Sequence, residues 1–137
     1  MRTTTFNTLL NKIYSHVLTI SLVWTSVIFI LCATPGQYIP TANWLALLSF
    51  DKLVHAGIFF VLSVLFFLVQ VKYHQHLIWR YVYFLTAVFY GVLLELMQAR
   101  YFSNRSADWK DAIADAFGCF MALIIFKKIV RLFVRQA

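Results

Sequence analysis

Residues 53–71 read LVHAGIFFVLSVLFFLVQV and contain no aspartate, glutamate, lysine or arginine. A helix of about 20 apolar residues crosses the hydrocarbon core of a bilayer, which is about 30 Å thick. Backbone groups in lipid must be satisfied within the segment itself, so we expect this stretch to be helical. Three further apolar stretches have similar lengths, at residues 14–32, 79–99 and 111–130. The sequence therefore predicts an all-α integral membrane bundle of four transmembrane helices.

The composition favours a membrane protein over a soluble one. Of 137 residues, 62% are hydrophobic and 12% are charged, whereas soluble domains are about half apolar and about a quarter charged. The length allows a single domain, residues 1–137. The net charge of +7 would suggest nucleic acid as the partner of a soluble protein. In a membrane protein the positive-inside rule explains the basic residues, so membrane lipids are the expected partners and nucleic acid is not.

The distribution of charges predicts an orientation. Four spans place both termini and the loop at residues 72–80 on one side, with eight lysines and arginines and no acidic residue. The opposite side has four lysines and arginines together with all five acidic residues. Basic residues favour the cytoplasmic side, so we expect a multi-pass protein of the inner (plasma) membrane with both termini in the cytoplasm. The acidic side then faces outward.

The longest connection, residues 33–50, carries no charge. Pro35, Gly36 and Pro40 prevent a continuous helix there, and the apolar residues return after Pro40. We expect an apolar interfacial loop between the first two spans, anchored by Tyr38 and Trp44 at the level of the head groups.

The second span opens with the sequence Asp51-Lys52-x-x-His55. Asp51 is expected near a helix N-terminus, where a carboxylate interacts favourably with the helix dipole. His55 lies four residues further, about 6 Å deeper on the same face. A carboxylate one turn from an imidazole sets its tautomer, which suits a general base, a metal ligand or a phosphate donor. A structural hydrogen bond between helices is the alternative.

Glu95 and Gln98 lie near the outward end of the third span, three residues apart and therefore on one face. An ionisable residue inside a membrane usually faces the interior of the bundle, because lipid exposure costs about 2.5–3.5 kcal/mol. We therefore expect both side chains in the interior, with a functional role or a role in holding helices together.

Asp108, Asp111 and Asp115 form one stripe at the start of the fourth span, which Gly118 continues. Asp108 is placed to cap the helix, and Gly118 permits close approach of another helix. Asp115 lies too deep for a capping role and needs a partner. The available cations are Lys52, His55, Arg105 and Lys110.

These motifs together resemble the VanZ-like family. The resemblance rests on Asp51-Lys52-x-x-His55, Glu95-x-x-Gln98, the following Arg105, and Asp111-x-x-x-Asp115-x-x-Gly118, within residues 51–121. Asp115 departs from the pattern, in which Asn is usual. The resemblance implies a small multi-helix membrane domain and a link to glycopeptide (teicoplanin) resistance.

Two functions of different class remain open. In the first, the cluster is part of a binding module for a phosphorylated lipid head group or another envelope component, with Asp51, Lys52, Gln98, Arg105, Asp108 and Asp115 as ligand-binding residues. In the second, the protein is an enzyme acting on a phosphorylated lipid or cell-wall precursor, with His55, Glu95 and Asp111 as catalytic residues. The sequence has no Cys/His metal spacing, so no metal centre or cofactor is predicted. If the cluster took up a cation, its oxygen-rich side chains would favour magnesium, calcium or manganese over zinc.

Overall fold

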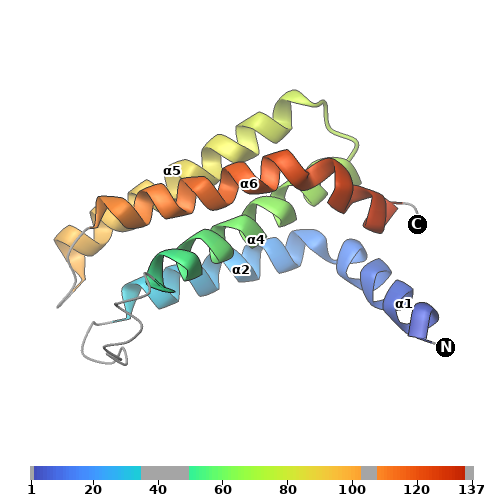
Figure 1. The fold of residues 1–137 in the computed structure, drawn as a ribbon, viewed down its shortest axis with the longest axis horizontal. Helices are drawn as coiled ribbons and strands as arrows, with labels where there is room; N and C mark the ends of the chain where they lie inside the picture. The colour runs from blue at the N-terminus through green and yellow to red at the C-terminus, as the bar shows by residue number, and fades with distance from the viewer. Residues whose placement is uncertain (1, 35–49, 103–107, 135–137) are drawn as a thin grey trace.

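The computed structural model describes residues 2–34, 50–102 and 108–134. Within these ranges the chain forms five helices and no strand: α1 (Arg2–Ser15), α2 (Val17–Ala33), α4 (Phe50–Lys72), α5 (Ile78–Tyr101) and α6 (Trp109–Val134). Helices α2, α4, α5 and α6 lie side by side along the long axis of the molecule, and α1 turns away at one end (Figure 1). The predicted all-α class is confirmed.

The first helix break was not predicted. The predicted span at residues 14–32 crosses the junction between α1 and α2, where the two helices bend by 75°. At this junction the ammonium of Lys72 donates a hydrogen bond to the backbone carbonyl of Ser15, and the Ser15 hydroxyl donates to the carbonyl of Lys12 at 2.8 Å. The Lys72 bond engages a carbonyl that a straight helix would use internally, which is a recognised cause of kinks. Residues 14 and 15 therefore belong to α1.

Helix α4 is the central element, because it packs against α2, α5 and α6. Its contact with α6 is the closest. A Cβ atom added to Gly118 would lie 2.0 Å from the carbonyl oxygen of Ala56. Only glycine fits at this crossing, as predicted for Gly118 from the sequence.

Hydrogen bonds from aromatic side chains tie α2 to the other helices. The indole of Trp24 donates to the carbonyl of Ile58 at 3.2 Å, and the hydroxyl of Tyr90 donates to the carbonyl of Thr25 at 2.9 Å. Each such bond is worth about 1 kcal/mol. Buried apolar residues fill the rest of the interior, with the rings of Phe67 and Phe126 in edge contact at 5.2 Å.

Large apolar side chains also cover the outside of the bundle. Leu22, Leu85 and Phe89 are 62%, 63% and 66% exposed, which is typical of a surface that faces lipid and not water. Within the described ranges, α4 and α5 are long and apolar enough to cross a membrane, and the bent pair of α1 and α2 makes a third candidate if it counts as one span.

Some sequence predictions lie outside the described residues. They are residues 35–49 of the interfacial loop predicted at 33–50, with Tyr38 and Trp44, and the cation Arg105. Of the same predicted loop, Ala33 is the last residue of α2 and Phe50 the first of α4.

Candidate functional site

The acidic residues gather at one end of the bundle, where α4 and α6 begin and α5 ends (Figure 1). Helix α5 runs antiparallel to both α4 and α6, so the chain returns to this end after α4. Side chains up to 64 positions apart, from Asp51 to Asp115, therefore lie at the same end. We call them the polar cluster: Asp51, Lys52, His55, Glu95, Asp108, Asp111 and Asp115.

Lys52 is the central cation of the polar cluster. Its ammonium donates hydrogen bonds to Asp108 at 2.8 Å, to Asp51 at 3.4 Å and to Asp111. The Lys52 bond with Asp108 holds the pKa of that exposed carboxyl below its ordinary value, with a smaller contribution from the backbone amide of Lys110. Lys52 therefore ties the start of α4 to the start of α6.

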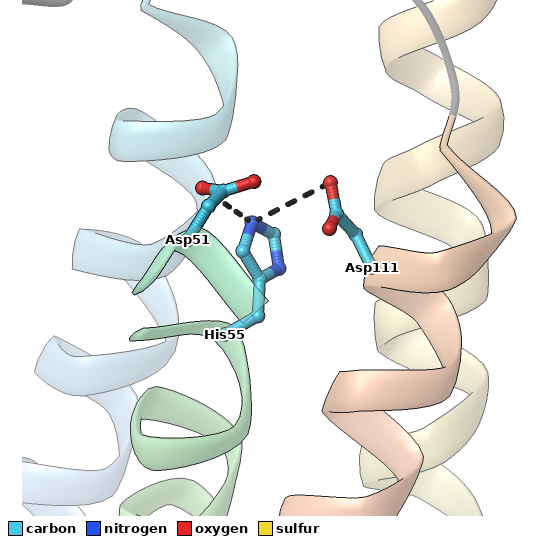
Figure 2. Close-up of side chains that lie close together, drawn as sticks. All are labelled: Asp51, His55 and Asp111. Atoms are coloured by element: carbon cyan, nitrogen blue, oxygen red, sulfur yellow. Dashed lines mark ion pairs between the residues drawn. The ribbon is translucent and has the colours of Figure 1, made fainter. Parts of the chain in front are cut away.

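His55 lies between carboxylates on both sides of its ring. Nδ1 is 3.0 Å from Oδ1 of Asp115, a hydrogen-bond distance. Nε2 lies 3.9 Å from Oδ2 of Asp111 and 4.0 Å from Oδ1 of Asp51 (Figure 2). It thus faces the solvent-exposed end of the cluster, which we call its opening, where the side chains of Asp51 and Asp108 are 66% and 39% exposed. The hydrogen-bond partner of the imidazole is thus Asp115 on the neighbouring helix, and Asp51, one turn away on α4, lies beyond hydrogen-bond distance.

Glu95 and Asp108 join α5 to α6. Glu95 is 6% exposed, and its Oε2 accepts a hydrogen bond from the backbone N–H of Asp108 at 3.0 Å. Oδ1 of Asp108 accepts from the backbone N–H of Lys110 at 2.9 Å. The latter bond caps α6, as the sequence predicts for Asp108.

Asp115 is the most deeply buried acid, at 2% exposure. Its carboxylate packs against α5 at Gly91, where an added Cβ would lie 2.9 Å from Oδ2 of Asp115. The sequence analysis did not single out Gly91. Its position one turn before Glu95, on the same helix face, was a signal for close packing of another helix beside Glu95.

Gln98 faces the interior with Glu95, as predicted, and is 5% exposed. Its amide donates to the carbonyl of Cys32 at 3.2 Å. This bond ties α5 to α2, away from the carboxylates of α4 and α6. Lys110 is exposed, and no ion pair joins it to a carboxylate in the described part of the chain.

A second polar group, which the sequence analysis missed, lies at the opposite end of the bundle. The guanidinium of Arg80 donates to Oε1 of Gln70 at 3.0 Å and lies 4.6 Å from the ring centroid of Phe126. The amide of Gln70 donates in turn to the carbonyl of Gln75 at 2.6 Å. These contacts join α4, α5 and α6 and explain why an arginine is tolerated beside an apolar ring.

The polar cluster is rich in negative charge. It includes all five acidic residues of the chain but, among the described residues, one lysine. Two sets of its side chains bring potential metal-ligand atoms within 4.8 Å of one another: Asp51, His55 and Asp111 at the opening, and His55, Glu95 and Asp115 inside. The arrangement therefore offers hydrogen-bond donors, a histidine held by a carboxylate, and oxygen ligands. In comparisons with known proteins, the chain matches no family model, no curated protein and no solved structure.

Proposed function

We propose that this protein is a binding module of the inner (plasma) membrane, with both termini in the cytoplasm. Its polar cluster faces outward and binds the phosphorylated head group of a lipid or another envelope component. On the motifs of residues 51–121 we also propose that the chain is VanZ-like and linked to glycopeptide (teicoplanin) resistance.

The proposed topology has four spans, with α6 as the fourth. Helix α6 carries charged residues near both ends, but between them Ile113, Phe117, Phe120 and Ile124 form an exposed apolar stripe. The opposite face, with Asp115, Gly118 and Ala122, is buried against the bundle. This pattern is typical of a span whose polar residues face the interior.

The observation that carries the binding proposal is the convergence of three helices on a polar cluster that stays open at one end. The side chains of Lys52 and Asp108 are 28% and 39% exposed, whereas that of Asp115 is 3% exposed. An external anion can therefore reach the Lys52 ammonium in exchange for Asp108. The deeper residues then serve to hold Lys52 and His55 in place.

One observation favours a second candidate function, an enzyme acting on a phosphorylated lipid or cell-wall precursor. The His55–Asp115 pair, with Nε2 directed to the opening, is the arrangement of a general base oriented by a carboxylate. In that function Glu95 and Asp111 would be the acidic partners of His55.

Binding of a short-chain phosphatidic acid to the purified chain in zwitterionic nanodiscs tests the binding proposal. The matched probe is the diacylglycerol of the same chain length, which lacks the phosphate. We expect phosphatidic acid to bind at least about tenfold more tightly, and Lys52→Gln to remove most of that difference. Lys110→Gln, a charge change at an exposed position of the same end, is the control and should leave it unchanged. Equal affinity for both probes would contradict the proposal.

Product analysis of the same incubations separates the two functions. A binding module leaves phosphatidic acid intact. Turnover that disappears in His55→Gln while the affinity remains would instead support the enzyme.

A further inference from the structure

His55, Glu95 and Asp115, which we call the inner set, include two buried carboxylates with few positive charges near them among the described residues. Glu95 and Asp115 are 6% and 2% exposed, and no lysine or arginine in the described ranges forms an ion pair with either. The imidazole of His55 lies beside them, with Nδ1 at 3.0 Å from Oδ1 of Asp115. A buried carboxylate without a counter-charge is strongly destabilising. Among the described residues, two buried carboxylates thus face one imidazole, an arrangement that a bound cation would stabilise.

The second group of potential ligands, Asp51, His55 and Asp111, forms the outer set, whose carboxylates already have a cationic partner. Asp51 and Asp111 share His55 with the inner set, but both carboxylates already accept hydrogen bonds from the Lys52 ammonium. A cation at the opening would have to displace that ammonium, whereas a cation inside would not.

The distances within the inner set suit a metal ion. Ligand atoms about 2.1 Å from an ion stand about 3.0 Å apart at a right angle and about 4.2 Å apart when opposite. Nδ1 of His55 and Oδ1 of Asp115 are 3.0 Å apart. One potential ligand atom from each of His55, Glu95 and Asp115 lies within 4.8 Å of the other two. Small side-chain movements would thus bring them around one ion.

The surroundings of the inner set support the same assignment. Oε2 of Glu95 is held by the N–H of Asp108, and Oε1 forms no hydrogen bond with a described residue. Nε2 of His55, the nitrogen away from the inner set, faces the carboxylates of Asp111 and Asp51 at 3.9 and 4.0 Å. A carboxylate beyond the far nitrogen of a ligating histidine is the usual outer-shell partner of a metal site.

We propose that His55, Glu95 and Asp115 form a binding site for a divalent cation, with Nδ1 and one oxygen of each carboxylate as ligands. One imidazole with two carboxylates suits manganese, which accepts both oxygen and nitrogen ligands. The site deepens the proposed function and rests on it for its role. A bound cation would offset part of the negative charge of the polar cluster and so strengthen the binding of a phosphate at Lys52.

Mn²⁺ itself is the probe for this site. The purified full-length chain, stripped of metals in detergent, is titrated with Mn²⁺ while electron paramagnetic resonance follows the free ion. We expect one bound Mn²⁺ per chain and a pulsed-resonance spectrum with the ¹⁴N coupling of an imidazole. Saturable binding without that nitrogen coupling, or no saturable binding at all, would overturn the assignment. This readout needs no variant, so it holds even where a substitution prevents folding.

Variants then separate the inner set from the outer one. Glu95→Gln and Asp115→Asn should each weaken Mn²⁺ binding at least about tenfold. Asp51→Asn removes the same charge at an exposed position outside the three ligands, so it should weaken Mn²⁺ binding clearly less than either inner substitution. Lys110→Gln, at an exposed position of the same end, should leave the affinity unchanged. An equal loss in Asp51→Asn and Asp115→Asn would move the ion to the opening and refute the inner site.

The lipid experiment distinguishes this inference from the proposed function. Preference for phosphatidic acid that is the same with and without Mn²⁺ would leave the binding module standing and remove the role proposed for the ion. Mn²⁺ binding with the expected nitrogen coupling, but without a preference for phosphatidic acid, would support the metal site and contradict the proposed binding of a phosphorylated head group.

Discussion

At the scale of single residues, the polar cluster depends on how a few cations are shared among five carboxylates. The Lys52 ammonium donates hydrogen bonds to Asp51, Asp108 and Asp111, and the His55 imidazole is hydrogen-bonded to Asp115. Asp108 has two further tasks, since its backbone N–H binds Glu95 and its side chain caps α6. Lys52, His55 and Asp108 therefore each join different helices, and substitutions at these three positions should have effects beyond their own helix.

Replacement of Lys52 by glutamine tests its structural role. The variant leaves Asp111, whose side chain is 14% exposed, without its ammonium partner. We expect the free energy of unfolding to fall by about 1–2 kcal/mol, because the pair is partly open to solvent. Thermal unfolding in detergent, followed by circular dichroism, measures the change. Lys110→Gln should have no comparable effect, and an equal loss in both variants would argue against a specific role for Lys52.

The ion pair of Lys52 with Asp108 predicts a dependence of stability on pH. The folded-state pKa of Asp108 is depressed by Lys52, so its contribution to stability is complete above the unfolded value of about 3.9. That contribution is lost as the pH falls through the folded value. The difference in melting temperature between the wild type and Asp108→Asn should therefore be constant near neutral pH and vanish in strong acid. A difference that grows on acidification would contradict this assignment.

At the scale of elements, the crossing of α4 and α6 holds the two halves of the polar cluster together. Ala56 and Gly118 lie at this crossing, next to His55 on α4 and one turn below Asp115 on α6. Small residues at such a point let two helix backbones approach closely, which in a membrane provides packing contacts and brings polar side chains within reach. The position of the site thus depends on the absence of a side chain.

Gly118→Ala is the direct test of this crossing. Its Cβ would lie 2.0 Å from the Ala56 carbonyl oxygen, a backbone atom, so the helices must separate. We expect a loss of about 2–3 kcal/mol in the free energy of unfolding. Gly57→Ala is the matched control, because an added Cβ there meets nothing within 4 Å and alanine favours the helix by about 0.5–1 kcal/mol. Equal melting temperatures for the two variants would show that the helices do not cross so closely.

At the scale of the whole molecule, the two ends of the bundle differ in charge. All the acidic residues lie at the end where α4 and α6 begin, and the basic Lys72, Lys127, Lys128 and Arg131 lie at the other. Helices α1 and α6 also bring the two termini to that basic end (Figure 1). This asymmetry is the basis for placing the polar cluster on the outer side.

Labelling of single cysteines tests the orientation. In a chain with Cys32→Ala and Cys119→Ala, cysteine is introduced by Lys110→Cys or Lys127→Cys, two exposed positions at opposite ends of α6. A membrane-impermeant maleimide should label the cysteine at position 110 in intact cells. It should label the cysteine at position 127 only after the cells are permeabilised. The reverse pattern would place the polar cluster in the cytoplasm.

The sequence by itself determined the helical class, the approximate helix positions and the face of each helix that carries polar residues. These follow from local properties: the length of apolar runs, the spacing of three or four between polar residues, and glycine at 118. It also correctly predicted the cap at Asp108 and the interior position of Glu95 and Gln98.

The tertiary structure alone decided which charges meet. Lys52 lies 59 positions before Asp111, and His55 lies 60 positions before Asp115. Such pairings depend on the rotation and offset of packed helices, which no local pattern specifies. The same holds for the bend at Ser15, which involves Lys72 from α4, for the contact of Gly91 with Asp115, and for Arg80 over Phe126. Each is a contact between residues of different helices, so its energy depends on a distance that only the folded chain sets.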